Sequence, residues 1–274
     1  MPYQNILHSR CFGLLLVFTL GLLFVGCSDD EAIISSTPSV GPRQSFLSSF
    51  YQSEELVYSF EYDGDKRLSR QVARFPEGNL VSEFEYNSVG KVSKMIGVRN
   101  GLILELNIFY NAEEQIDSIF SISDGSPWVI NKFLYDDMRQ LTRMMEYAPV
   151  TRTLVFNDYY WSDGDITRRE TYFPQGAERL EERWVVEYKY DSLTNPFNVV
   201  YQDIGFHLID REPISQHNWT SMRIFNKSTG RTFREIDKEY QYLGNGFPSR
   251  KRTYVYNGGD RSEDQEGVIA DFFY

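Results

Sequence analysis

A tyrosine recurs along the chain every 24 or 25 residues, and this repeat constrains the fold more than any other feature of the sequence. Each tyrosine is followed by a turn rich in Asp, Asn or Gly and, six positions later, by an aliphatic residue such as Leu68. Two strands and two turns fill about 24 residues at typical strand lengths. Units of this period cannot bury their own faces, so the copies are expected to stack side by side. The repeat tyrosines are Tyr62, Tyr86, Tyr110, Tyr135 and Tyr160.

Apolar and polar residues alternate within the copies, which predicts β-strands. Leu104, Leu106 and Ile108, for example, fall on one face of a strand. We find no convincing helical stripe longer than two turns. The sequence therefore predicts an all-β fold: an antiparallel hairpin meander of about a dozen strands, forming one domain over residues 46–274. Because wide sheets twist, we expect a curled open sheet, a roll or a partial barrel.

The stretch from residue 193 to 235 departs from the repeat. Asn195-Pro196 predicts a break, because proline cannot donate to a β-ladder and restricts the residue before it. The segment from Phe206 to Ile209 fits either a short helix or a buried turn. Strands are expected again over 231–242 and 251–256, with the chain finishing on Phe272-Phe273-Tyr274.

The first 26 residues predict a secretory signal peptide. An apolar run from Cys11 to Val25 follows Arg10, and it is shorter than the ~20 residues that a membrane-spanning helix needs. Phe24-Val25-Gly26-Cys27 resembles the lipobox of bacterial lipoproteins. That resemblance implies cleavage before Cys27 and acyl chains, palmitate among them, on the new N-terminal residue. Two or more acyl chains make membrane anchoring stable.

The four residues after Cys27 are acidic or small: Ser28, Asp29, Asp30 and Glu31. They resemble the export signal of Bacteroides-group lipoproteins, which implies the outer membrane and display at the cell surface. An ordinary acidic linker is the alternative. Residues 27–45 then form a lipidated cysteine and a Ser/Pro-rich flexible tether. With Cys11 removed and Cys27 lipidated, the mature chain has no pair of cysteines for a disulfide.

The tyrosine–turn–aliphatic unit resembles the YD repeat of wall-associated and Rhs-type bacterial surface proteins over about residues 58–190. The chain also resembles β-rich Bacteroides-group lipoproteins that contain a domain of unknown function. This second resemblance rests on Tyr188-Lys189-Tyr190-Asp191, Asn195-Pro196-Phe197 and Gly246-Phe247-Pro248. Both resemblances imply a sheet of β-hairpins at the cell surface, and neither implies an activity.

Motifs for catalysis and cofactor binding are absent from the sequence, including the nucleophile elbow, the phosphate loop and the dinucleotide fingerprint. His207 and His217 are better explained as ordinary histidines than as metal ligands with Asp203 or Asp210. A net charge of −11 argues against a nucleic-acid partner. We therefore expect no cofactor and no metal.

The sequence favours a non-enzymatic module that binds or scaffolds a glycan or protein partner. A structural spacer or shell protein is a second interpretation. A third is an unrecognised glycoside hydrolase, which would need two carboxylates in one cleft.

Two sets of residues are candidate sites. Asp117-Ser118-Ile119 and Asp191-Ser192-Leu193 resemble an O-glycosylation sequon, which makes Ser118 and Ser192 candidates for modification. Aromatic rings stack on sugars, so the four tryptophans are candidate ligand-binding residues: Trp128, Trp161, Trp184 and Trp219.

A basic side chain stands eight positions after four of the five repeat tyrosines: Arg70, Lys94, Arg143 and Arg168, with Ser118 in the third copy. In stacked hairpins these positions form a row on one face of the sheet. The row fits either a positive stripe for an anionic glycan or cross-strand pairing with Asp and Glu. Pairing is favoured, because like charges directly opposite one another repel.

Overall fold

The computed structural model describes residues 47–52, 55–76, 78–173, 183–200, 206–207, 212–213, 215–259 and 267–274. The predicted signal peptide, Cys27 and the residues 28–31 lie outside these ranges. Two units make up the chain: a smaller one of Met1–Gln44 with Phe75–Gly78, and a larger one of Ser45–Arg74 with Asn79–Tyr274. None of the helices in the described part is long and apolar enough to cross a membrane.

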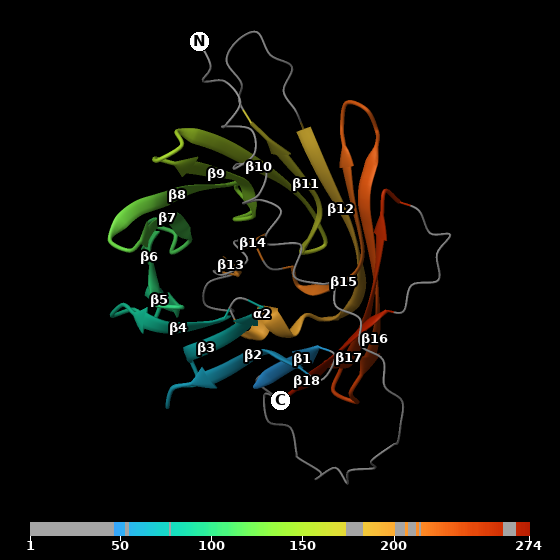
Figure 1. Cartoon of the computed structure of the whole chain (residues 1–274), viewed down its shortest axis with the longest axis horizontal. Coiled ribbons are helices and arrows are strands. Elements are labelled where there is room, and N and C mark those ends of the chain that lie inside the picture. Colours follow the sequence, from blue (N-terminus) through green and yellow to red (C-terminus); the bar gives the residue numbers. More distant parts are fainter. Residues whose placement is uncertain are drawn as a thin grey trace. The chain divides into compact units, whose positions relative to one another are not determined.

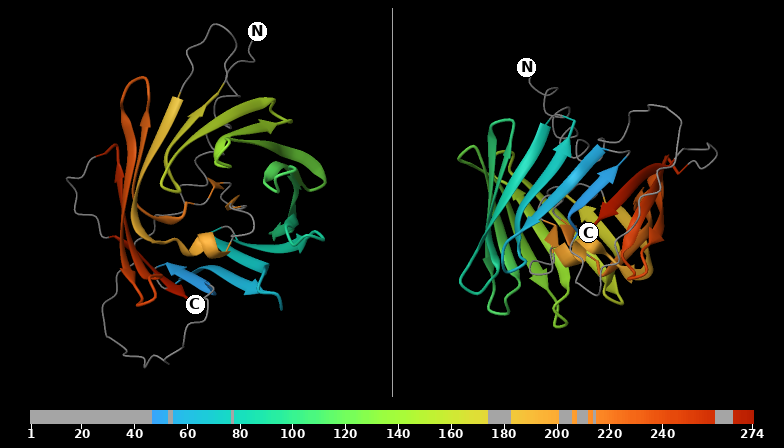
Figure 2. Two further views of the ribbon diagram at one scale, coloured as in Figure 1. Left: turned by 180° about the vertical axis from the view of Figure 1, so that it is seen from behind. Right: turned by 90° about the horizontal axis from the view of Figure 1, so that it is seen from below.

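Sixteen antiparallel strands form a closed barrel in the order β1-β18-β17-β16-β15-β12-β11-β10-β9-β8-β7-β6-β5-β4-β3-β2 (Figure 1). Both further views show the same continuous wall (Figure 2). A short helix and a separate two-stranded sheet, β13-β14, complete the described elements. The bounds are β1 Ser49–Gln52, β2 Glu55–Tyr62, β3 Leu68–Phe75, β4 Gly78–Tyr86, β5 Val92–Arg99, β6 Leu102–Tyr110, β7 Ile116–Ser123, β8 Ser126–Tyr135, β9 Leu141–Ala148, β10 Thr153–Ser162, β11 Asp165–Tyr172, β12 Arg183–Thr194, α2 Pro196–Val200, β13 Phe206–His207, β14 Glu212–Pro213, β15 His217–Asn226, β16 Thr232–Tyr242, β17 Pro248–Asn257 and β18 Val268–Phe273.

The predicted all-β antiparallel meander is confirmed, but the predicted number of strands and the prediction of an open or partly closed sheet were wrong. The sheet has sixteen strands rather than about a dozen, and it closes. Closure comes from β1 and β18, where Phe50 lies opposite Phe272. These two strands stand at opposite ends of the sequence, so no local pattern reports their pairing.

Four of the five repeat turns are fastened by the side chain that follows the tyrosine. Asp63 Oδ1 accepts the N–H groups of Asp65 and Arg67, both at 2.9 Å. Lys66, four positions after Tyr62, has a positive φ of 64°. The turns after Tyr86 and Tyr110 repeat both acceptor contacts, and the turn after Tyr135 repeats the second. Asp or Asn is therefore needed at this position, because its short side chain caps the turn.

The repeat tyrosines link neighbouring strands by side-chain hydrogen bonds. The hydroxyl of Tyr86 donates to the carbonyl of Leu68 at 2.8 Å, and that of Tyr110 donates to Val92 at 2.7 Å. Leu68 lies beside a register shift between β2 and β3. An irregular ladder leaves backbone groups unpaired, so the hydroxyl supplies a partner that the strands do not. This bond explains a preference for Tyr over Phe.

The fifth copy of the repeat differs from the prediction. Trp161, rather than Tyr160, reaches the preceding strand, and its Nε1 donates to the carbonyl of Leu141 at 2.7 Å. Tyr160 is 46% exposed. The pairing of β10 with β11 shifts register between these two residues, which exchanges their positions relative to the earlier copies.

The inner face of the wall is identified by α2, which lies inside the ring of strands (Figures 1 and 2). The ring of Phe197 in α2 contacts those of Phe50, Tyr58 and Phe60, each with centroids 6.3 Å apart. Directly opposite residues share a face, so the strand register carries this inner face around the barrel. Buried inward positions include Phe84, Met95, Leu106, Ile119, Phe133 and Met144.

Candidate functional site

The chain between β12 and β15, residues 195–216, is called the lumen insert here. Its labelled elements α2, β13 and β14 lie inside the ring of strands (Figure 1). The helix starts where the sequence predicted a break: Asn195 Oδ1 accepts the N–H of Phe197 at 3.0 Å, and Pro196 fills the first helical position. Phe206 and His207 form β13 rather than a helix or a turn; Ile209 lies outside the described residues.

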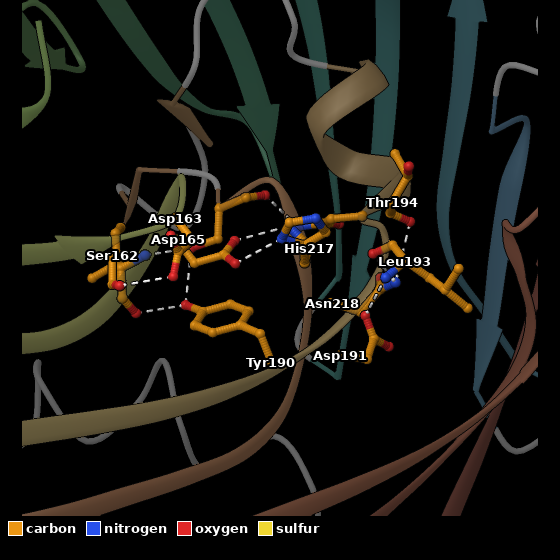
Figure 3. A network of polar contacts seen from close by, with 12 residues as sticks. Ser162, Asp163, Asp165, Tyr190, Asp191, Leu193, Thr194, His217 and Asn218 are labelled. Carbon is orange, nitrogen blue, oxygen red and sulfur yellow. Dashed lines mark hydrogen bonds and ion pairs between the residues drawn. The ribbon is translucent and has the colours of Figure 1, made fainter. Parts of the chain in front are cut away.

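A polar network joins the end of the lumen insert to the barrel wall (Figure 3). Asp165 at the start of β11 is 6% exposed. Its Oδ1 accepts the N–H of His217 at 2.9 Å, and its Oδ2 lies 2.7 Å from His217 Nδ1. One carboxylate therefore holds both the backbone and the ring at the start of β15.

Ser215 extends this network to β12. Its hydroxyl donates to the Tyr190 hydroxyl at 2.9 Å and accepts the N–H of Ile166 at 3.1 Å. Tyr190 in turn donates to the carbonyl of Ile166 at 2.7 Å. Serine, histidine and aspartate are the residue types of a nucleophilic triad. Here Ser215 is engaged by Tyr190 and Ile166, so the arrangement fits a fastening of the insert better than an activated nucleophile.

The other end of the lumen insert is held by Asn218 and Asp191. Asn218 Nδ2 donates to the carbonyls of Leu193 and Thr194 at 3.0 and 3.1 Å. The Asp191 carboxylate accepts the hydroxyl of Tyr242 and the N–H of Leu193. Burial and this bond to Asp191 raise the pKa of the Tyr242 hydroxyl well above its usual value. The network thus fixes the chain where it enters and where it leaves the lumen.

The Asp165–His217 pair was missed from the sequence. The sequence predicts an ordinary histidine at position 217 and does not predict a partner for it. The two residues are 52 positions apart, and nothing in their local sequence marks the pairing. Within the described ranges, no group of three His, Cys, Asp or Glu side chains could hold a metal ion. The alternative ligands Asp203 and Asp210 lie outside those ranges.

The four candidate tryptophans come from β8, β10, β12 and β15. Trp161 donates a hydrogen bond to the carbonyl of Leu141, as the repeat tyrosines do to the preceding strand in the earlier copies. Trp184 packs on Phe233 with ring centroids 4.2 Å apart. Trp219 makes an edge contact with Tyr188, and Lys238 Nζ lies 3.0 Å from its ring centroid.

The remaining candidate residues are placed on three different strands. Trp128 stands in β8, beside a register shift between β7 and β8. Ser118 in β7 is half-buried, and its hydroxyl donates to Asp117 at 3.1 Å. Ser192 in β12 is exposed. The tryptophans and serines therefore do not form one site.

The outer face of the wall is rich in ion pairs. Members of the predicted basic row contact carboxylates: Lys94 with Glu105 at 3.0 Å, and Arg143 with Asp158 at 2.5 Å. Arg70 contacts Glu61, Arg168 contacts Glu170, and Arg250 in β17 contacts Asp271. The prediction that carboxylates neutralise the basic row is confirmed. Charges thus face outward on strands all around the barrel, whereas the inner face is mainly apolar with some buried polar residues, such as Gln71, Asn131 and Asn157.

One outward carboxylate is almost completely buried. Glu170 is 3% exposed, and Lys227 Nζ and Arg168 lie 2.8 and 2.6 Å from its oxygens. Burial by itself raises the pKa of this carboxyl, but the hydrogen bond to Lys227 and the charge of Arg168 outweigh it and hold the pKa below its usual range. The ion pair of Glu170 with Lys227 joins β11 to the turn between β15 and β16.

A groove of about 510 Å³ runs along the outer face over β11, β12, β15 and β16. Its lining includes both positive and negative side chains: Arg168, Glu187, Lys189, Arg223 and Glu235. A second hollow of about 420 Å³ lies over β8 to β10 beside Arg143 and Asp158.

Comparisons with known proteins identify the fold. No family model matches the chain, and no curated protein matches it by sequence. A porin-like protein from Bacteroides uniformis ATCC 8492 is similar in structure, with a TM-score of 0.51 and 11% identity, over 83% of this chain and 96% of that one. A second porin-like protein, from Bacteroides vulgatus ATCC 8482, has a TM-score of 0.41 and 13% identity, over 84% of this chain and 99% of that one. The first similarity shows that this barrel fold occurs in a solved structure.

Proposed function

We propose that this chain is a non-enzymatic, lipid-anchored outer-membrane protein whose barrel faces water and binds a partner at its surface. The observation that carries the proposal is the polarity of the wall. Membrane-spanning barrels present an apolar band about 25 Å tall to lipid and a polar interior. Here Phe84, Met95 and Leu106 are buried on the inner face, whereas Arg143–Asp158 and Arg250–Asp271 lie outside.

The cost of burying such outward charges in lipid supports this choice. An Arg or Lys on the lipid face costs roughly 2–4 kcal/mol at the middle of the bilayer. Strands on opposite sides of the wall carry these residues, so an inserted barrel would meet the cost repeatedly. A wall of this kind needs another attachment to the membrane, and acyl chains on Cys27 supply it. The porin-like description of the structure from Bacteroides uniformis supports an outer-membrane setting.

The lumen insert supports binding rather than conduction. Asp165, His217 and Ser215 fasten its end to the wall, and α2 packs on inward-facing rings. The outer groove beside Arg223 and Glu235 is the surface proposed to receive a glycan or protein partner. The charged groups of its lining would bind polar ligand groups and fix their orientation.

Replacing Cys27 tests the anchor. With radiolabelled palmitate, the wild type should be labelled and should fractionate with the outer membrane. The Cys27→Ser variant should lose the label and leave that fraction, because the thiol that carries the lipid is gone. Cys11→Ser is the matched control and should behave as the wild type, because Cys11 is removed with the signal peptide. Equal retention of wild type and Cys27→Ser in the membrane would contradict the proposal.

A further inference from the structure

Exposed apolar side chains lie at both ends of the barrel, and the larger set of them encircles one end, which is called the turn end here. It carries the repeat turns after β2, β4, β6 and β8 and the turn after β16, because alternate connections of an antiparallel meander lie at the same end. Three of these turns present an apolar residue to solvent. Val89 is 68% exposed, Met138 is 79% exposed and Leu243 is 42% exposed.

Four more exposed apolar or aromatic side chains belong to strands that finish at the turn end. Phe109 and Leu134 stand one residue before the ends of β6 and β8 and are 55% and 42% exposed. Tyr160 near the end of β10 and Phe273 at the end of β18 are also exposed. These four and the three turn residues are called the apolar rim. Its members come from strands spread around the barrel, so they encircle the turn end rather than form a patch on one side.

The chain that leads to the predicted anchor joins the barrel at this same end. The Tyr62 hydroxyl, at the end of β2, donates to the carbonyl of Leu47 at 2.8 Å. Leu47 therefore lies at the turn end. Cys27 precedes it by 20 residues, which reach at most about 70 Å when fully extended. A barrel tethered in this way meets the bilayer at a high local concentration, so weak contacts suffice to orient it.

We propose that the turn end docks on the surface of the lipid bilayer, with the apolar rim in the headgroup region. This inference rests on the proposed lipid anchor. Single exposed apolar residues are common on protein surfaces, but a ring of them around the end that carries the tether matches a planar lipid surface. The same turns carry the exposed acids Asp65, Glu113, Glu114 and Asp137 beside Lys66 and Arg139. The surface that fits is thus a zwitterionic one rather than a strongly anionic one.

The opposite end also carries exposed apolar side chains, among them Leu102 and Ile103, but the tether does not join the barrel there, so it supplies a matched control. Val150, in the hairpin between β9 and β10, is 79% exposed, as is Met138. The mature chain has no thiol besides the lipidated one, so Met138→Cys and Val150→Cys each accept a single fluorescent label. Both labelled proteins are mixed with an excess of phosphatidylcholine vesicles whose acyl chains carry nitroxide quenchers. In chains without acyl chains, Cys11→Ser and Cys27→Ser keep the label single, and lipid in excess still allows that label to be read.

The label at position 138 should be quenched, and the label at position 150 should fluoresce as it does in water. Replacing Val89 and Leu243 by Ser should lower the vesicle partition coefficient of the 138-labelled chain by about tenfold or more. Equal quenching at both positions, or none at either, would overturn the docking. Palmitate incorporation in the same samples reports the anchor separately, so an unquenched label on a palmitoylated chain contradicts the docking and leaves the anchor standing.

Discussion

Lys251 in β17 departs most clearly from the usual chemistry of its residue type. It lies opposite Tyr240 and Ala270 on the inner face, and its Nζ is 4.8 Å from the ring centroid of Phe50. Burial lowers the pKa of its ammonium group to about 8. The inner face therefore destabilises the charged form, as expected of a wall whose interior is apolar. Alternation in the sequence predicted inward-facing residues on β17, but nothing local distinguished this lysine from the exposed Arg250 and Arg252.

The stability of the protein should rise with pH because of Lys251. Between pH 8 and its unfolded value near 10.5, the folded state has lost the proton that the unfolded state still binds, so raising the pH favours folding. For a half-buried side chain we expect a gain of about 2 kcal/mol across this window. Urea unfolding at pH 7.5 and 9.5 should show the gain in the wild type and its loss in Lys251→Met.

Buried tyrosines set the highest pH at which the effect of Lys251 can be measured by itself. Burial raises the pKa of Tyr62 and Tyr135 well above 10. Their contribution is complete below pH 10 and is lost as the pH rises above it, so it does not enter the comparison at pH 9.5. Parallel behaviour of wild type and Lys251→Met would show that the lysine ammonium is solvated and that the inner face near Phe50 is open to water.

At the scale of elements, the repeat was predictable and its bonding was not. The spacing of tyrosine, Asp or Asn, and aliphatic residue predicted the strand ends and turns of β2 to β9. It did not reveal that the tyrosine hydroxyl donates a hydrogen bond to a carbonyl at the start of the preceding strand. For Tyr110 and Val92, that bond spans 18 residues. The displaced fifth copy shows the same limit. A bulge decides between Tyr160 and Trp161, and bulges depend on the pairing of two strands.

Removing one hydroxyl tests this ladder. Tyr110→Phe should destabilise the barrel by about 1–2 kcal/mol, because the Val92 carbonyl loses its donor while the ring stays in place. Tyr160→Phe is the control and should change stability by less than about 0.5 kcal/mol, because Tyr160 is exposed. Chemical denaturation of the two variants beside the wild type gives both values. Equal effects would show that the hydroxyl bonds do not contribute to stability.

The lumen insert shows why the candidate site was harder to predict than the fold. Asn195-Pro196 marked the end of β12 correctly, since the pair caps a helix. The partners that fasten the insert lie far away in sequence, as Ser215 does from Ile166 and His217 does from Asp165. Local sequence shows that a segment leaves the sheet. The segment lies in the lumen only because distant strands close the barrel around it, and local sequence does not report that closure.

At the scale of the whole molecule, alternation predicted one apolar face and one polar face without saying which face closure would enclose. An open sheet could cover its apolar face with another element. The sixteen-stranded wall instead turns that face inward against α2 and itself, and it leaves the ion pairs outside. The mainly apolar interior and the charged exterior are the observations on which we base the proposal that the barrel does not span the bilayer.

Cutting the tether tests this central claim most directly. A recognition site for a specific protease is placed between Glu31 and Ser45, and isolated outer membranes are treated with the enzyme. The account predicts that the barrel appears in the supernatant without detergent, as a folded and monodisperse protein, because the acyl chains supply the stable attachment and the contacts of the apolar rim are weak without them. Untreated membranes, and membranes bearing the wild type without the site, should retain it. A cut barrel that stays with the membrane through an alkaline carbonate wash would contradict the account and show that the wall itself is embedded in lipid.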